Sequence, residues 1–320
     1  MPTLSPSRNS WPSRRRALAA AGLILFAAAC AGTASGPAPA ASARPIGTVS
    51  PSGHATLHVW PSRGPTQAVI LALHGFGDAG ELAFGDAAAY WAGHGITVYA
   101  PDLPGFGGNP DRKRWPGVDA LVAETVALSR RVAAAHPRVP LVVVGESMGG
   151  GIALLAADEG LAADALVLSA PAIAGGDSLS PAARTGARLL AVVAPEKRWT
   201  GEGMVELWPT DNMAALRRTA ADPRHFGDPS SRELYGLVEL MDRAAAAAPD
   251  VDRPTLTLMG RNDEILRPEN VARVATRIPG AIGYIEYPNG WHWLFRDLDA
   301  AVVWRDVADF ALSPTGAARD

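Results

Sequence analysis

The feature that most constrains this chain is a regular alternation of apolar runs and helical patterns between residues 68 and 171. The apolar runs cover residues 68–74, 96–102, 140–147 and 163–171. A strand that is apolar throughout is buried on both faces, which is typical of a parallel sheet covered by helices. The sequence therefore predicts an α/β fold with a mostly parallel sheet and helices on both faces.

The alternation stops after residue 174 and resumes near residue 251. Residues 175–250 contain helical patches and no strand candidate, whereas two further strand candidates, 254–260 and 281–288, each precede a helical pattern. We expect a helical cap over 175–250, inserted after the sixth strand. It would divide the core into 53–174 and 251–314, followed by a tail at 315–320.

The N-terminus is typical of an export signal rather than of a folded domain. Residues 1–16 carry four arginines and no acid, and the apolar segment that follows is too short to span a bilayer. We expect a signal peptide over 1–29. Cys30, the chain's only cysteine, follows Ala27-Ala28-Ala29 and resembles the lipidated cysteine of a bacterial lipoprotein, although leucine is more usual at the position of Ala27. An ordinary signal peptidase site is the alternative, and Ser13-Arg14-Arg15 also resembles a twin-arginine export motif.

Residues 30–52 are small, proline-rich and nearly uncharged, so we expect a flexible tether. A lipidated Cys30 would make the protein an exported lipoprotein of the bacterial cell envelope, anchored to a membrane; without lipidation it would be periplasmic or secreted. The net charge of −3 and the scattered lysines and arginines argue against a nucleic-acid partner.

The motif Gly145-Glu146-Ser147-Met148-Gly149 lies between an apolar run and a helical pattern. In that context G-x-S-x-G is typical of a nucleophile elbow, where a tight turn holds the serine at its tip and tolerates little but glycine beside it. The helix that follows directs its N–H groups at the site. The alternative is a tight turn with no chemistry.

A nucleophilic serine needs a base, and the base needs a carboxylate that orients it. His292 lies in a loop after the last predicted strand, between Trp291 and Trp293, whereas five others, His54, His58, His94, His136 and His225, are expected to be surface or packing residues. Asp263 comes three residues after the strand that ends at Gly260; it is shorter than its competitor Glu264 and comes first in the loop, so we expect Asp263 to be the acid. The order Ser147, Asp263, His292 is that of the α/β-hydrolase fold.

Gly75, Gly77 and Gly80 also match the G-x-G-x-x-G of dinucleotide-binding loops, with Asp102 at a suitable distance. Three features argue against a dinucleotide. His74 replaces the expected small residue, Asp102 is followed by a glycine- and proline-rich loop instead of a helix, and nucleotide binding leaves Ser147, Asp263 and His292 unexplained.

The chain resembles α/β-hydrolases of the monoacylglycerol lipase and lysophospholipase group. The matching segments lie within residues 68–312 and read LHGFGD, APDLPGFGGNP, VVVGESMGGGIALLAA, SAPAI, PTLTLMGRNDEILRP and GWHWLFRD. The resemblance implies an oxyanion hole formed by the N–H groups of Phe76 and Met148, and no cofactor or metal. Phe106 stands where this group often has a histidine.

The expected function is that of a serine hydrolase that cleaves esters of single-chain lipids, either monoacylglycerol or lysophospholipid. Two alternatives stay open: a carboxylesterase for small soluble esters, and a lipid-binding lipoprotein without catalysis. Apolar residues of the expected cap would either line an acyl channel or form the cap's own core; they are Trp199, Met204, Trp208 and Met213.

Overall fold

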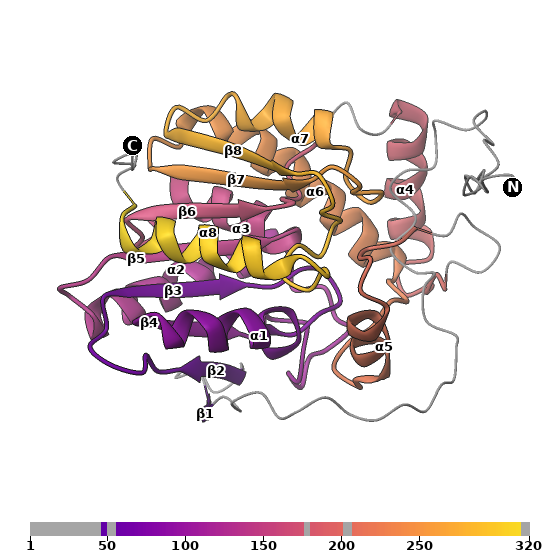
Figure 1. The fold of residues 1–320 in the computed structure, drawn as a ribbon. Coiled ribbons are helices and arrows are strands. Elements are labelled where there is room, and N and C mark those ends of the chain that lie inside the picture. The colour runs from indigo at the N-terminus through magenta and orange to yellow at the C-terminus, as the bar shows by residue number, and fades with distance from the viewer. Residues whose placement is uncertain (1–45, 50–55, 176–179, 201–206, 315–320) are drawn as a thin grey trace, which may run out of the picture.

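The computed structural model describes residues 46–49, 56–175, 180–200 and 207–314. Its centre is an eight-stranded sheet in the order β1-β2-β4-β3-β5-β6-β7-β8 (Figure 1). The strands are β1 (Ile46–Val49), β2 (Thr56–Trp60), β3 (Ala68–Leu73), β4 (Ile96–Pro101), β5 (Leu141–Glu146), β6 (Ala165–Ser169), β7 (Thr255–Gly260) and β8 (Ala281–Tyr287). The pairs β1–β2 and β2–β4 are antiparallel and all other pairs are parallel. The predicted mostly parallel sheet is confirmed.

The central strands are buried on both faces, as their sequence predicts. Every residue of β3, β5, β6 and β7 is buried, while β8, at the edge, has no buried residue. Along β3 the side chains alternate between two cores: Val69, Leu71 and Leu73 belong to one, Ile70 and Ala72 to the other. This alternation follows from the period of two in a strand and requires helices on both sides.

Helices cover both faces of the sheet. On one face lie α1 (Gly80–Gly93) and α8 (Ala300–Leu312), tied by a hydrogen bond of 2.8 Å from the Trp91 indole N–H to the carbonyl of Trp304. On the other face lie α2 (Val118–Ala135) and α3 (Met148–Asp158), with α7 (Pro268–Ala275) near β7 and β8. The site-bearing loops therefore emerge from a rigid three-layer scaffold.

The segment between β6 and β7 contains α4 (Pro181–Val193), α5 (Met213–Ala221), α6 (Ser231–Ala247) and the short 3-10 helix η1 (Ala248–Asp250). Figure 1 shows α4 and α5 beyond the carboxyl ends of the parallel strands, where a cap is expected. In contrast, α6 packs on α3: a Cβ at Gly151 would lie 2.4 Å from Leu240, and Met241 belongs to the same core cluster as Ile152. The range predicted for the cap therefore includes a helix that packs on α3 and shares its hydrophobic core.

The range predicted for the tether, 30–52, also needs correction. The structure places β1 at Ile46–Val49, paired antiparallel with β2. Strand pairing uses main-chain N–H and C=O groups, so a short segment whose only large apolar residues are Ile46 and Val49 can still extend a sheet. The predicted signal peptide, Cys30, the rest of the tether and the tail at 315–320 lie outside the described residues. None of the helices described is long and apolar enough to cross a bilayer.

Candidate active site

Ser147 occupies the turn between β5 and α3 in a conformation that side chains rarely adopt, with φ 53° and ψ −114°. Only glycine fits at the flanking positions 145 and 149, because a Cβ at either would collide with backbone atoms. A Cβ at Gly145 would lie 2.4 Å from the carbonyl oxygen of Gly149, and one at Gly149 would lie 2.0 Å from that of Leu73. The Ser147 N–H donates to the Ser169 carbonyl at 2.9 Å, which fixes the turn on β6. The sequence motif is thus a sharp strand-to-helix turn with a serine at its tip.

Asp263 and His292 come together from the loops after β7 and β8. His292 Nδ1 donates to Asp263 Oδ2 at 2.8 Å, and both side chains are buried. The second oxygen, Asp263 Oδ1, accepts the N–H groups of Ile265 and Leu266, each at 2.8 Å. The carboxylate is therefore held by its own loop and holds the imidazole in turn.

The two acids after β7, of which the sequence favours Asp263, make different contacts. Glu264 Oε2 accepts the backbone N–H of Trp208 at 2.8 Å and so contacts the segment before α5. Asp263, not Glu264, is the partner of His292.

The protonation behaviour of His292 is set by opposing influences. Burial lowers the pKa of the imidazole, but the charge of Asp263 and its hydrogen bond outweigh burial and raise this pKa above its ordinary value. An imidazole that gains a proton more readily beside a carboxylate is suited to accept one from a serine hydroxyl.

The loop between β3 and α1 passes directly beside the nucleophile. A Cβ at Gly75 would lie 3.4 Å from Ser147 Cβ, so the backbone of Gly75 and Phe76 approaches the elbow closely. Met148 begins α3, and the first N–H groups of a helix have no partner within it. The structure brings both predicted oxyanion residues to the elbow, and their role as donors stays a prediction.

Phe76 is fixed by two other phenylalanines. Its ring contacts Phe106 at 5.2 Å and Phe226 at 5.7 Å between centroids, both edge to face, and Phe106 and Phe226 are stacked at 5.7 Å. The Phe226 N–H also donates to the Gly77 carbonyl at 2.9 Å. Phe106, which replaces the histidine frequent in the resembling group, thus packs against the loop that carries Phe76.

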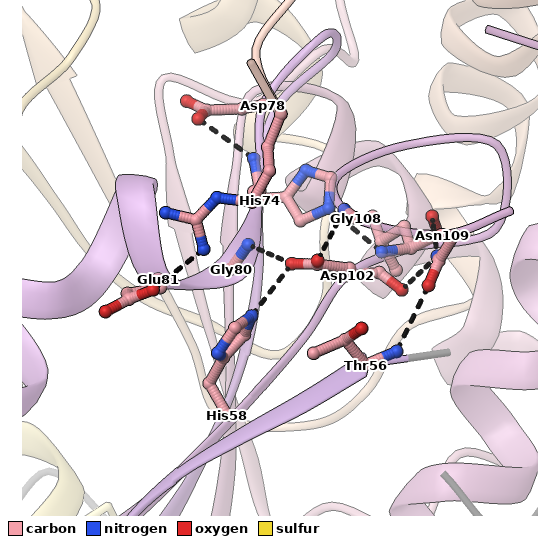
Figure 2. A network of polar contacts seen from close by, with 12 residues as sticks. Thr56, His58, His74, Asp78, Gly80, Glu81, Asp102, Gly108 and Asn109 are labelled. Carbon is pink, nitrogen blue, oxygen red and sulfur yellow. Dashed lines mark hydrogen bonds and ion pairs between the residues drawn. The ribbon is translucent and has the colours of Figure 1, made fainter. Parts of the chain in front are cut away.

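Asp102, which the dinucleotide hypothesis would assign to a ribose, is occupied within the protein (Figure 2). Its Oδ1 accepts the Gly80 N–H at 2.9 Å and contacts His58 Nε2 at 3.1 Å, and its Oδ2 accepts the Gly108 N–H at 2.8 Å. Burial raises the pKa of Asp102, but the hydrogen bonds from His58 and Gly108 outweigh it and lower this pKa. The carboxylate holds two loops together, which supports the rejection of a dinucleotide site.

His74 has a similar structural role. Its Nδ1 contacts the Gly75 carbonyl at 2.8 Å and its Nε2 accepts the Leu103 N–H at 2.9 Å (Figure 2). Burial lowers the pKa of His74, consistent with a neutral ring that donates through one nitrogen and accepts through the other.

Sequence reasoning missed one buried ion cluster at the site, formed by Asp78, Glu146 and Arg296. Two signals pointed to it: a glutamate inside the nucleophile motif, and an arginine four residues after His292. Neither signal says which residues pair. Within the described part of the chain, no group of three or more histidine, cysteine or acidic residues could hold a metal ion.

Comparison with known proteins places the chain in a family. Residues 64–299 match the model of the Hydrolase_4 family, described as serine aminopeptidase, S33. A monoacylglycerol lipase of Mycolicibacterium smegmatis is 29% identical over 273 residues, which cover 80% of this chain and 91% of that protein.

Solved structures share the fold. The crystal structure of a monoacylglycerol lipase from Paleococcus ferrophilus superposes with a TM-score of 0.69 at 21% identity, covering 80% of this chain and 98% of that one. A soluble variant of monoglyceride lipase from Saccharomyces cerevisiae, in complex with a substrate analog, gives a TM-score of 0.73 at 19% identity over 87% and 99% of the two chains.

Proposed function

This chain is a serine ester hydrolase that belongs to the Hydrolase_4 family (serine aminopeptidase, S33), and we propose that it cleaves monoacylglycerol-type esters through an acyl-enzyme. Ser147 is the nucleophile, His292 the base and Asp263 its orienting acid. The observation that carries the proposal is the buried hydrogen bond between Asp263 and His292 at the sheet edge where Ser147 sits strained at its turn.

The mechanism follows from these positions. His292 takes the proton of the Ser147 hydroxyl as its oxygen attacks the ester carbonyl. The N–H groups of Phe76 and Met148 stabilise the oxyanion, an effect of about 3–4 kcal/mol per donor. His292 then gives the proton to the leaving alcohol, and water, activated by the same imidazole, hydrolyses the acyl-enzyme.

The exposed face of the cap supports a lipid substrate. Leu189, Val192 and Val193 of α4 are 60%, 73% and 65% exposed, and they are three and four residues apart, which places them on one face. Exposed apolar stripes of this kind favour contact with lipid over water. Of the four cap residues expected to line a channel or form a core, Trp208 and Met213 are 37% and 39% exposed, Trp199 is half-buried, and Met204 lies outside the described residues.

The proposal is tested by labelling and by hydrolysis. A fluorophosphonate should label the wild-type protein at Ser147, and Ser147→Ala should abolish labelling and hydrolysis of monoacylglycerols while leaving Tm nearly unchanged. A series of acyl chain lengths on monoacylglycerols, lysophospholipids and p-nitrophenyl esters separates a lipase from a small-ester carboxylesterase. Residual activity of Ser147→Ala near wild type would refute the nucleophile, and an unlabelled wild type would favour a non-catalytic lipid-binding protein.

We further propose that the protein is exported and anchored to a bacterial envelope membrane through a lipid on Cys30. The support is the arginine-rich start, the short apolar segment and the single cysteine after three alanines. Cys30→Ser should move the protein from the membrane fraction to the soluble fraction. Full retention of Cys30→Ser in the membrane fraction would contradict lipid anchoring at this residue.

A further inference from the structure

The three loops that build the site meet at one arginine. Arg296 Nη1 donates to Asp78 Oδ2 at 2.6 Å, and Nη2 donates to Glu146 Oε2 at 2.8 Å. Asp78 lies in the loop that carries Phe76, and Glu146 is bonded to Ser147. Arg296 itself follows His292 by four residues in the loop after β8. One guanidinium thus contacts the oxyanion loop, the nucleophile elbow and the loop of the base.

We propose that Arg296 is a positioning residue for ester hydrolysis, which fixes the relative placement of Phe76, Ser147 and His292 by binding Asp78 and Glu146 together. The inference rests on the proposed function, because it assigns a role in the chemistry of those three residues. Arg296 does not act on the substrate. It acts through the two carboxylates that it holds.

The geometry requires an arginine in particular. A guanidinium is planar and offers separate N–H arms in fixed directions, so it can bind two carboxylates from different loops at once. An ammonium is a point charge on a flexible stem, and at this site a lysine would contact one carboxylate well and the other poorly. The relative placement of the Asp78 loop and the Glu146 turn therefore depends on the two N–H arms of the guanidinium.

The loop that presents Arg296 is itself held firmly. The guanidinium lies over the Trp293 ring at 4.0 Å from its centroid. The backbone N–H of Arg296 donates to the backbone carbonyl of Trp293 at 2.8 Å. The next residue, Asp297, accepts the Thr210 hydroxyl at 2.6 Å and the Trp291 N–H at 2.7 Å. A displacement of Arg296 would therefore be transmitted to His292, which lies between Trp291 and Trp293.

Stabilisation of the fold does not explain why these three ionisable groups are buried together. Arg296, Asp78 and Glu146 are 7%, 2% and 1% exposed, and burying three ionisable groups carries a desolvation cost that ion pairing often fails to recover. Apolar residues of similar volume are often as stable at such positions. A buried cluster at the meeting point of three site loops is better explained by placement.

The charges of the cluster shift the pKa of His292, so changing them should shift the pH profile of hydrolysis. The titratable or charged groups that influence His292 are Asp263, Glu146 and Arg296; those near Glu146 and Asp78 also include Asp297, His74 and His225. Glu146 raises the pKa of His292 and Arg296 lowers it. Removing the cation should raise this pKa, whereas removing the Glu146 charge should lower it.

The test measures kcat, KM and the pH profile of kcat/KM for the full chain in detergent, with a monoacylglycerol and a p-nitrophenyl ester. The variants are Arg296→Lys, Arg296→Met and Glu146→Gln. Arg243→Lys is the matched control, because Arg243 of α6 also contacts two carboxylates, Asp119 on α2 at 2.7 Å and Glu159 after α3 at 3.9 Å, none of them in the three site loops. Active enzyme is counted by fluorophosphonate titration, so misfolded protein does not enter kcat.

Arg296→Lys should lower kcat about 100-fold, as expected for a misplacement of about 1 Å, with KM changed less than about threefold. The acid limb of its kcat/KM pH profile should lie at the same pH as in the wild type, since lysine keeps the positive charge at this position. The acid limb should move to higher pH in Arg296→Met and to lower pH in Glu146→Gln. Arg243→Lys should keep the wild-type kcat and pH profile.

A wild-type kcat in Arg296→Lys, or equal losses in Arg296→Lys and Arg243→Lys, would overturn the inference while leaving the proposed function intact. An inactive, unlabelled wild type would instead refute the proposed function and this inference with it. If Arg296→Met does not fold, Arg296→Lys and Glu146→Gln decide the question. Each replaces the original side chain with one of similar length that can still form a hydrogen bond in the cluster.

Discussion

Two neighbouring carboxylates after β7 serve different parts of the molecule. Asp263 is fixed by two backbone N–H groups of its own loop and binds His292 through its remaining oxygen. Glu264 is longer and reaches the backbone of Trp208. The shorter side chain is the one whose position is determined by its own backbone, which suits a group that must hold an imidazole in one orientation.

Replacing Asp263 should therefore be far more damaging than replacing Glu264. In Asp263→Asn the amide no longer selects the tautomer that leaves Nε2 free of a proton, and it no longer stabilises the imidazolium. We expect kcat to fall by about 10⁴-fold.

Steady-state kinetics on a p-nitrophenyl ester check this prediction, with Glu264→Gln as the control of similar chemistry and position. Glu264→Gln should keep activity within about tenfold of wild type, since the glutamine carbonyl oxygen can still accept the Trp208 N–H. Equal losses in the two variants would show that the acid has been misassigned.

At the scale of elements, the cap and the core are coupled through the segment between α5 and α6. Phe226 inserts its ring against Phe76 and Phe106, and its N–H binds the Gly77 carbonyl. Gly77 has φ +73°, and a Cβ there would lie 2.2 Å from the Phe226 carbonyl oxygen. The cap segment and the oxyanion loop are thus in main-chain contact, and the position of one determines the position of the other.

Phe226→Ala should lower both stability and turnover. Loss of a buried phenylalanine costs about 3–5 kcal/mol of the free energy of unfolding. Because the lost ring supports the loop that carries the Phe76 N–H, we expect kcat of the folded fraction to fall as well, by about 10-fold or more.

The matched control is Phe310→Ala on α8, which removes a buried ring from the core on the opposite face of the sheet. Denaturant unfolding and titrated kcat values separate the two effects. Phe310→Ala should lose stability and keep kcat; an unchanged kcat in Phe226→Ala would argue against coupling between cap and oxyanion loop.

For the whole molecule, the buried carboxyl groups make stability depend on pH near neutrality. Burial raises the pKa of Glu146 to about 7 against the influence of Arg296, and burial raises that of Asp297 to about 6. Each raised pKa means that the folded state keeps a proton which the unfolded chain has released. Each group therefore stabilises the fold at low pH, and this contribution is lost as the pH rises through the folded-state pKa.

Glu146→Gln should remove one of these dependences. The amide cannot ionise, so the free energy of unfolding of wild type relative to Glu146→Gln, and with it the relative Tm, should fall as the pH rises from about 5 to about 8. The free-energy loss is about 1.4 kcal/mol for each unit by which the pKa is raised. Glu239→Gln, an exposed glutamate on α6, is the control and should show a constant difference. A Tm difference for Glu146→Gln that is also constant with pH would contradict the raised pKa.

The sequence by itself determined the features that depend on short spacings. Buried strands follow from uninterrupted apolar runs, and the elbow follows from five adjacent residues in which only glycine fits beside Ser147. His292 and the two candidate acids were found because parallel strands present their following loops at one edge of the sheet. These signals are local, because each depends on the backbone conformation of a few neighbouring residues.

The tertiary structure alone decided what depends on contacts between distant segments. It showed that Asp263 and not Glu264 contacts His292, that the Asp102 carboxylate is already hydrogen-bonded to two loops, and that α6 packs on α3 although it lies in the range predicted for the cap. Arg296 meets partners 218 and 150 residues away. No spacing in the chain encodes such pairs, because they form only when the packing of the sheet brings separate loops together.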